Sequence, residues 1–180
     1  MSFQDFLNKY SRTLVMGILN ITPDSFYDKK KYSKLNSLKD RFQKLHKLNI
    51  IDIGAESSRP GANPISELDE LNRISKVFKF LTDSNKYYSI DTYKPNVARE
   101  SIKAGFNMIN DIKGGGNLEM LQVASEFKVP IILMHMQGNP SYMQNNPQYD
   151  DVIDELMNYF ENRINRAIKE GINKKEIIID

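Results

Sequence analysis

Short apolar runs alternate along this chain with longer segments that repeat apolar residues at helical spacing. The runs are apolar at consecutive positions, which is typical of parallel strands covered on both faces. They lie at 14–19, 50–53, 87–91, 107–111, 131–135 and 177–180. Strands that alternate with helices predict right-handed βαβ crossovers and a parallel sheet, which limits the chain to a few α/β architectures.

The segments between the runs carry helix signals at their ends. Ser66 with Asp69 resembles a capping box that opens a helix extending to Phe78. Pro95 suits a first helical turn, and Gly105 suits the position just past a helix end. Further helices are expected at 35–45, 117–127 and 153–168, the last followed by Gly171.

The fold class expected from this order is α/β, a parallel (β/α)8 TIM barrel in incomplete form. The chain offers about six strands and five helices, whereas a full barrel has eight of each in roughly 250 residues. An open doubly wound sheet is the rival architecture, but the Gly-rich turn of dinucleotide-binding folds is missing after the first run. We therefore expect residues 1–180 to form a single barrel domain that is truncated at its C-terminal end.

The composition argues against several kinds of partner. The 25 basic and 23 acidic residues are scattered and leave a net charge of +2, so no basic stripe for nucleic acid is present. No apolar run is long enough to span a membrane, and residues 1–10 lack the apolar stretch of a signal peptide. The chain has no cysteine, which fits a cytoplasmic protein without disulfides or thiolate metal sites.

Polar residues stand at or just after the ends of the predicted strands. Because the carboxyl ends of parallel strands meet at one mouth of a barrel, we expect these side chains to gather where barrel enzymes place their chemistry. Carboxylates and amides buried there need donors, a metal or a ligand to offset their desolvation. The residues concerned are Asn20, Asp52, Glu56, Ser58, Arg59, Asp91, Asn110, Asp111, His135 and Asp180.

Each of these residues also has a structural interpretation. An isolated Asp or Asn at a strand end more often caps a helix or closes a turn than it binds a ligand. Asp52 and Asp111 are open to interpretation as partners of backbone amides, and His135 as a hydrogen-bonded core residue. Spacing and composition therefore predict a site for a polar ligand without naming that ligand.

Five segments narrow the prediction. In chain order they read GILNITPDSF at 17–26, DIGAESSRPG at 52–61, SIDTYKP at 89–95, INDI at 109–112 and LMHMQGNP at 133–140. Each resembles a signature of the dihydropteroate synthases, and five of them in the family's order are a specific match. The likeness runs from Val15 onward and corresponds to the first two-thirds of a synthase.

The resemblance implies an enzyme of folate biosynthesis. Such an enzyme joins 6-hydroxymethyl-7,8-dihydropterin diphosphate to p-aminobenzoate and releases pyrophosphate. The resemblance assigns the polar edge of the pterin to Asp91, Asn110 and Asp180, because a carboxylate accepts two parallel N–H bonds and an amide both donates and accepts. Ile112 and Met134 would pack on the flat ring.

For the diphosphate, the resemblance implies Mg²⁺ as the cofactor, bound by the side-chain carbonyl of Asn20. Ser58, where the family usually has Thr, and Arg59 would bind phosphate oxygens. Asp28 would hold the loop after the first strand to Arg59 or to the metal. Asp91 and Arg59 are the expected catalytic residues.

For the second substrate, the resemblance implies a flat apolar slot walled by Phe26 and Pro60. Loss of pyrophosphate would leave a resonance-stabilised pterin methylene cation, which the arylamine attacks without prior deprotonation. This mechanism needs no strong nucleophile or general base, and the sequence has no Ser–His or Cys–His arrangement that would supply one.

Two other functions stay open at this point. A folate-dependent methyltransferase of the same superfamily would hold methyl-tetrahydrofolate, although residues 58–61 and Phe26 suit a diphosphate and an arylamine better. A truncated paralogue would bind pterin or an intact subunit without turnover. The resemblance stops at Asp180, before a Lys, an Arg and a His of the family, so we expect the 180-residue chain alone to be inactive. The family's homodimer is expected as well.

Overall fold

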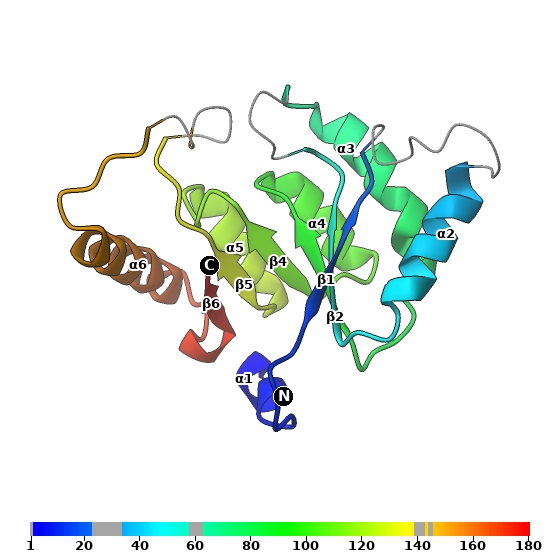
Figure 1. Cartoon of the computed structure of the whole chain (residues 1–180), viewed down its shortest axis with the longest axis horizontal. Helices are drawn as coiled ribbons and strands as arrows, with labels where there is room; N and C mark the ends of the chain where they lie inside the picture. Colours follow the sequence, from blue (N-terminus) through cyan, green and yellow to red (C-terminus); the bar gives the residue numbers. More distant parts are fainter. Residues whose placement is uncertain (1, 23–33, 58–62, 139–142, 144–145) are drawn as a thin grey trace.

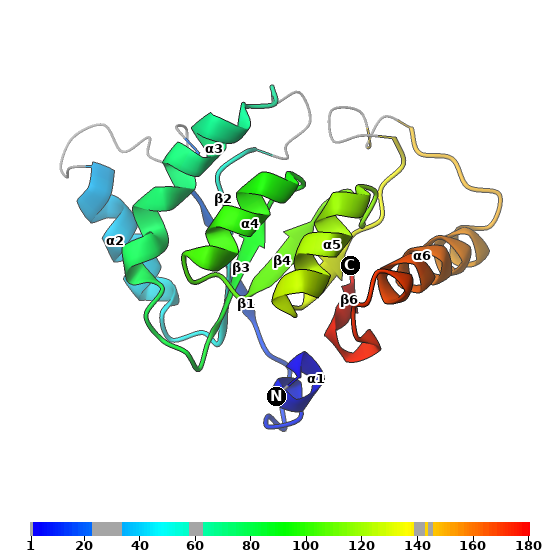
Figure 2. The same ribbon diagram turned by 180° about the vertical axis from the view of Figure 1, so that it is seen from behind.

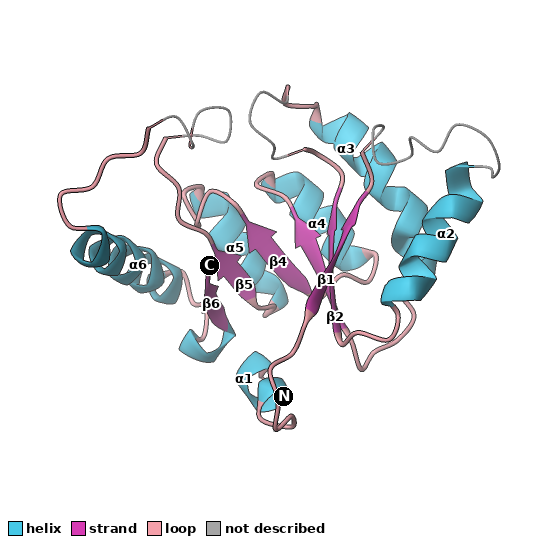
Figure 3. Cartoon of the chain, viewed as in Figure 1, coloured by secondary structure: helices cyan, strands magenta, loops and turns pink. Residues whose placement is uncertain are grey.

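The computed structural model describes residues 2–22, 34–57, 63–138, 143 and 146–180. In this part of the chain, six parallel strands form one sheet, in the order in which they occur in the sequence (Figure 3). The strands are β1 (Met16–Asn20), β2 (Ile50–Gly54), β3 (Tyr87–Asp91), β4 (Met108–Asp111), β5 (Ile131–Leu133) and β6 (Ile177–Ile179). Each strand pairs with the next, so the sheet is wound in one direction as in a barrel, whereas a doubly wound sheet reverses its strand order.

Within the described residues, five helices connect these strands and pack on one face of the sheet, which we call the outer face. They are α2 (Lys34–Leu45), α3 (Glu67–Ile74), α4 (Pro95–Lys103), α5 (Leu118–Phe127) and α6 (Val152–Lys169). Figure 2 shows α3, α4 and α5 in front of the strands, and Figure 1 shows them behind. Right-handed crossovers place successive helices on the same face. The arrangement confirms the expected α/β class with an incomplete (β/α)8 barrel, because β1 and β6 do not pair in the described part of the chain.

The outer face and the helices share one hydrophobic core. Ile53, Ile90 and Ile109 belong to this core and are fully buried. Leu38 and Phe42 bring α2 into the same cluster. Since successive side chains of a strand alternate between faces, the residues next to these isoleucines lie on the opposite, inner face.

A short helix, α1 (Phe3–Leu7), covers the inner face at the N-terminal ends of the strands (Figure 1). Ser2 and Asp5 form a reciprocal capping box at its start. Phe3 and Phe6 pack in a second hydrophobic cluster, together with Ile50, Met108 and Ile132 from the strands. The sequence analysis did not predict this helix, because it is too short to show a helical period.

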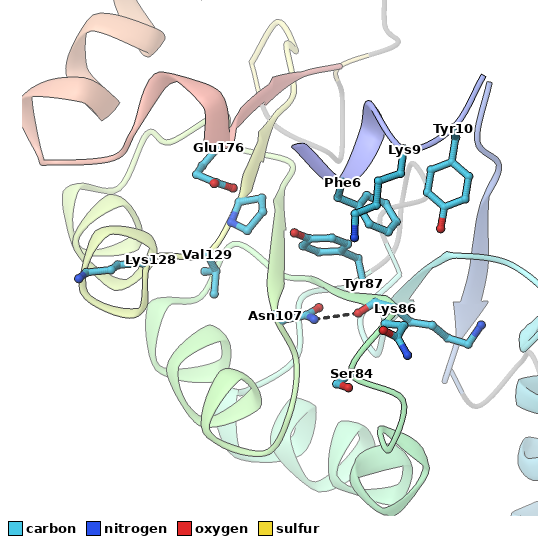
Figure 4. A pocket seen from close by; sticks show the side chains of 12 residues that line it. Phe6, Lys9, Tyr10, Ser84, Lys86, Tyr87, Asn107, Lys128, Val129 and Glu176 are labelled. Atoms are coloured by element: carbon cyan, nitrogen blue, oxygen red, sulfur yellow. Dashed lines mark hydrogen bonds between the residues drawn. The ribbon is translucent and has the colours of Figure 1, made fainter. Parts of the chain in front are cut away.

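A pocket of about 370 Å³ lies between α1 and the chain that enters β3, β4 and β5 (Figure 4). Asn107 lines it, but the side-chain amide already donates to the Lys86 carbonyl at 2.9 Å and accepts from the Tyr88 N–H at 2.7 Å. The pocket is at the N-terminal ends of the strands, away from the ends that carry the polar motif residues.

Several expected helix ends are confirmed. The Ser66 hydroxyl caps α3 by accepting from the Asp69 N–H at 3.1 Å. Pro95 is the first residue of α4. Gly105 and Gly171 follow α4 and α6 with φ values of +116° and +93°, which a residue with a Cβ adopts only with strain.

Two expectations about the elements were wrong. The helix predicted to reach Phe78 is α-helical only to Ile74 and continues as a 3-10 helix, η2 (Ser75–Phe80), a common form of a last turn. β1 is not covered on both faces, because Ile18 on its inner face is 63% exposed.

A second 3-10 helix, η3 (Lys174–Glu176), precedes β6. Among the helices described, none is long and apolar enough to cross a membrane.

Candidate functional site

Three polar residues line up at the C-terminal ends of the strands. In the register of the sheet, Asn20 pairs with Gly54, Gly54 with Asp91, and Asp91 with Asn110. Neighbouring strands lie about 4.8 Å apart and residues in register share a face. Asn20, Asp91 and Asn110 therefore form a row, here called the inner row, and the glycine leaves a gap within it.

Asp52 lies just below the inner row, two residues before Gly54 on the same face. Its side chain is only 4% exposed, and its Oδ2 accepts a hydrogen bond from Asn110 Nδ2 at 3.2 Å. Burial raises the pKa of the Asp52 carboxyl. Ser89, its register partner on β3, is close enough to oppose part of this shift. Within the described residues, however, neither the Ser89 hydroxyl nor Asp52 Oδ1 makes a hydrogen bond of normal geometry. An unpaired buried oxygen costs on the order of 1–3 kcal/mol, so it indicates a missing donor such as a ligand N–H.

Asp91 stands at the centre of the inner row. Burial, followed by the charges of Asp52 and Glu70, raises the pKa of its carboxyl to about 7. One of its carboxylate oxygens lies directly over Gly54, where an added Cβ would come within 2.8 Å of Oδ2. The glycine therefore makes room for the carboxylate, and a carboxyl that titrates near neutral pH in a semi-buried cluster is typical of functional sites.

Asp180 extends this polar group toward β6. Its N–H donates to the Leu133 carbonyl and its carbonyl accepts from the His135 N–H, both at 3.1 Å, which fixes the backbone beside β5. Ile178, two residues earlier, packs in the inner cluster with α1, so alternation turns the Asp180 side chain inward. Its charge acts on Asp52 and contributes to the raised pKa of that carboxyl.

Ile112 and Met134, the residues expected to pack on a ring, directly follow β4 and β5 respectively. Both are half-buried. The Met134 carbonyl accepts from the Tyr159 hydroxyl of α6 at 3.1 Å. The backbone at the end of β5 is thus tied to the helix that follows it.

Asp111 and His135 do not join the inner row, although both stand at strand ends. Asp111 is next to Asn110 and therefore faces the other way. Its carboxylate accepts from the Lys113 and Gly115 N–H groups at 2.8 and 2.9 Å, so it holds the turn after β4. The His135 ring packs edge-on against Tyr159, with 4.7 Å between ring centroids. It is half-buried against α6 and is not a core residue.

Five predicted site residues lie outside the described residues. They are Phe26, Asp28, Ser58, Arg59 and Pro60. The roles assigned to them, in the p-aminobenzoate slot and around the diphosphate, stay predictions.

The predicted metal ligand, Asn20, is half-buried at the end of β1 in the inner row. Across the part of the chain that the structure describes, no three His, Cys, Asp or Glu side chains cluster closely enough to hold a metal by themselves. Mg²⁺ commonly takes one or two protein oxygens and completes its shell with substrate phosphates and water. A single amide oxygen at this mouth fits a Mg²⁺ ion of that kind.

The polar inner row on a singly wound parallel sheet can be compared with known families. The family described as pterin binding enzyme matches residues 16–180. This chain belongs to that family of pterin-binding enzymes. The match includes every strand of the sheet and every residue of the inner row.

Among its relatives in the pterin-binding family, dihydropteroate synthase from Escherichia coli K12 is 43% identical over 172 residues, which is 92% of this chain and 60% of that protein. A solved dihydropteroate synthase from Xanthomonas albilineans with 4-aminobenzoic acid is 35% identical and superposes with a TM-score of 0.84, covering 94% of this chain and 61% of that one. A dihydropteroate synthase from Burkholderia cenocepacia complexed with 7,8-dihydropteroate is 33% identical, with a TM-score of 0.80 and coverage of 95% and 59%. The chain thus spans about 60% of the length of these pterin-binding relatives.

Sequence reasoning placed Asp52 among the polar residues at the barrel mouth but assigned it no ligand role and left it open as a partner of backbone amides. The signal that was available is the alternation of β2, which puts Asp52 and Gly54 on one face while Ile51 and Ile53 face the core. What the sequence could not supply is the neighbour across the sheet, because the bond from Asn110 spans 58 residues of chain.

Proposed function

We propose that this chain forms the pterin-binding part of a dihydropteroate synthase. The reaction condenses 6-hydroxymethyl-7,8-dihydropterin diphosphate with p-aminobenzoate to 7,8-dihydropteroate and pyrophosphate. The observation that carries the proposal is the inward-facing group of Asp52, Asp91 and Asn110, with an unpaired buried carboxylate oxygen, at the C-terminal ends of a barrel-type sheet. The relatives solved with 4-aminobenzoic acid and with 7,8-dihydropteroate support it.

The polar edge of a pterin matches the chemistry of this group. Ring N–H and amino groups in one plane are donors, and an ionised carboxylate accepts two of them in parallel. Asp91 and Asp180 would take such donor pairs, and the Asn110 amide would both donate and accept. Ile112 and Met134 would pack on the faces of the ring, where an apolar and a polarizable side chain are suitable.

The same carboxylates suit the charge that develops during the reaction. The C–O bond to the diphosphate breaks with its electron pair on the leaving oxygen, and the pterin methylene becomes positive. Asp52 and Asp91, shielded from water on the inner face, would stabilise that positive charge. The p-aminobenzoate nitrogen then forms the new C–N bond and releases its proton to solvent.

The leaving diphosphate is proposed to bind beside this group. Ser58 and Arg59 would bond its oxygens, Arg59 through its two-pronged guanidinium. Asn20 would hold Mg²⁺, which when bound neutralises part of the diphosphate charge. Asp28 would steady the loop after β1, and Phe26 and Pro60 would wall the slot for the benzene ring.

Product formation tests the proposal. The 180-residue chain and the protein with its natural ends are each given the pterin diphosphate, p-aminobenzoate and Mg²⁺, and dihydropteroate and pyrophosphate are quantified. We expect the protein with its natural ends to release both products in equal amounts, and benzoate, which lacks the amine, to yield no condensation product. A protein that binds methyl-tetrahydrofolate and forms no dihydropteroate would contradict the synthase assignment and favour a methyltransferase.

A further inference from the structure

The hydroxyl of Tyr159, on α6, touches two backbone segments at the mouth of the sheet. It donates to the Met134 carbonyl, directly after β5, at 3.1 Å. It also lies against Gly114 in the turn after β4, because a Cβ added to that glycine would overlap the hydroxyl. The same Cβ would come within 2.5 Å of the Met134 carbonyl. One phenol oxygen thus meets the turn after β4 and the exit of β5 at a single point.

The ring that carries this hydroxyl is fixed on several sides. The His135 ring packs edge-on against it at 4.7 Å between centroids, and the Phe160 ring does so at 5.3 Å. The Arg163 guanidinium lies 4.9 Å from its centre, a distance at which a cation is attracted to the face of a ring. The hydroxyl is therefore held in place beside the Met134 carbonyl and does not swing freely.

The turn after β4 is also held by its own hydrogen bonds. The Asp111 carboxylate accepts from the Lys113 and Gly115 N–H groups at 2.8 and 2.9 Å. Its backbone carbonyl accepts from the Gly114 N–H at 2.9 Å. Ile112, the first residue of this turn, is therefore attached to a well-fixed backbone, and Tyr159 packs against that backbone two residues later.

Ile112 and Met134 leave neighbouring strands side by side. Asp111 and Leu133 are in register, and each of the two residues directly follows one member of that pair. Leu133 packs in the core of the outer face, so alternation turns Met134 to the inner face. Asp111 faces outward, so Ile112 also turns inward. The two side chains therefore stand on the face that carries the inner row, and the Tyr159 hydroxyl lies between the backbone segments that support them.

A flat ring that packs against two side chains is sensitive to the distance between them. Dispersion is strongest when carbon atoms lie about 3.5–4.0 Å apart, and a further gap of about 0.5–1 Å forfeits roughly a quarter to a half of it. A small displacement of either backbone segment would therefore weaken packing on the faces of a bound ring. Hydrogen bonds at the polar edge of the ring, which belong to the inner row, do not depend on this spacing.

We propose that Tyr159 is a positioning residue for the pterin ring: its hydroxyl, held between the exit of β5 and the turn after β4, sets the distance between Ile112 and Met134. This inference rests on the proposed function. It assigns to Tyr159 no contact with substrate. The residue acts through the two backbone segments on the flat faces of the ligand, whereas the inner row acts on its polar edge.

The test compares two ligands that share one polar edge. They are 6-hydroxymethyl-7,8-dihydropterin and 2,6-diaminopyrimidin-4-one, a single ring with much less flat surface. Dissociation constants are measured by calorimetry on the protein with its natural ends. Tyr159→Phe keeps the ring and removes only the hydroxyl, so we expect it to weaken pterin binding about fivefold or more and to change binding of the single ring about twofold or less. In turnover assays, KM for the pterin diphosphate is expected to rise more than kcat falls.

Tyr10→Phe is the matched control. The Tyr10 hydroxyl also takes part in one hydrogen bond, from the Asn49 amide at 2.8 Å, but it lies beside α1 at the opposite ends of the strands. We expect this variant to bind both ligands as the wild type does. Gly114→Ala is a second test variant, whose Cβ would displace the Tyr159 hydroxyl, and it should lose pterin affinity in the same selective way.

Three results would overturn this inference and leave the proposed function intact. They are an unchanged pterin affinity in Tyr159→Phe, an equal loss for both ligands in that variant, and an equal loss in Tyr159→Phe and Tyr10→Phe. A wild type that binds the single ring as tightly as the pterin would do the same, because the ring faces would then contribute nothing. A wild type that binds neither ligand would overturn the proposed function and the inference with it.

Discussion

Asp91 and Gly54 depend on each other across the β2–β3 pair. The carboxylate occupies the space that a side chain on Gly54 would fill, and the strand register puts the two residues side by side. The position of one oxygen atom in the inner row is thus set by the absence of a Cβ on the neighbouring strand. This contact can be tested without removing any polar group.

Gly54→Ala is expected to displace the Asp91 carboxylate and weaken pterin binding about tenfold or more, because the new Cβ would meet Oδ2 at 2.8 Å. The measurement is a calorimetric titration with 6-hydroxymethyl-7,8-dihydropterin. Gly17→Ala is the control, since its Cβ would press on Leu45 and Leu48 on the other face. Gly17→Ala should lower the free energy of unfolding and leave pterin affinity unchanged. A loss of affinity in Gly17→Ala with none in Gly54→Ala would contradict the account.

Asp91→Asn is expected to stabilise the protein in a pH-dependent way. The pKa of Asp91 is raised from 3.8 to about 7, so the folded state binds this proton more tightly than the unfolded state. Stability from this group is complete at low pH and is lost as the pH rises through about 7. The neutral amide should therefore raise the free energy of unfolding on the order of 2 kcal/mol at about pH 8, with a gain that shrinks toward about pH 4. Urea unfolding at the two pH values checks this, and an equal gain at both would contradict it.

At the residue scale, the sequence predicted which polar residues stand at strand ends, but not which face of the sheet their side chains point to. Asp52 and Asp111 had the same open interpretation, as partners of backbone amides. Asp111 took that role with Lys113 and Gly115, and Asp52 instead faced Asn110. Neighbouring residues on a strand point to opposite faces. A shift of one position therefore decides whether a side chain bonds the local backbone or faces the candidate site.

At the scale of elements, helical period and end signals placed the starts of the longer helices, although α3 ends at Ile74 and not at the predicted Phe78. β3 and the caps of α3 and α4 fall where the sequence placed them. α1 has five residues and no period to detect, and its packing partners come from strands far along the chain. It also bonds the opposite end of the chain, since the Phe3 N–H donates to the Glu176 carboxylate at 3.1 Å.

Truncation of Phe6 tests whether α1 stabilises the fold. Phe6 is 3% exposed and its ring lies 4.7 Å from that of Tyr87. Phe6→Ala is expected to lower the free energy of unfolding by about 3–5 kcal/mol, the usual cost of removing a buried ring. Gln4→Ala, an exposed change in the same helix, should cost little. Because α1 is at the far end of the strands, pterin affinity per folded molecule should not change; a loss of affinity equal to that of an inner-row variant would contradict this separation.

At the scale of the whole molecule, the strand order is the most informative feature. Sequential pairing from β1 to β6 places the connecting helices α2 to α6 on the outer face and every inner-row residue at one mouth. Counting apolar runs predicted the number of strands and the barrel-type winding. It did not predict that the inner face beside β1 is open, because exposure of Ile18 depends on which segments lie across the sheet rather than on local sequence.

The most direct test of the account is a titration of 6-hydroxymethyl-7,8-dihydropterin into the wild type, Asp91→Asn and Asp111→Asn. The two aspartates are both shielded from water and both have a raised pKa, but only Asp91 belongs to the inner row. We predict that Asp91→Asn loses at least about a hundredfold in affinity, because the amide cannot accept two parallel N–H bonds. Asp111→Asn should bind 6-hydroxymethyl-7,8-dihydropterin as the wild type does, per folded molecule. If Asp91→Asn binds as well as the wild type, or if both variants lose affinity equally, the inner row is not the pterin site.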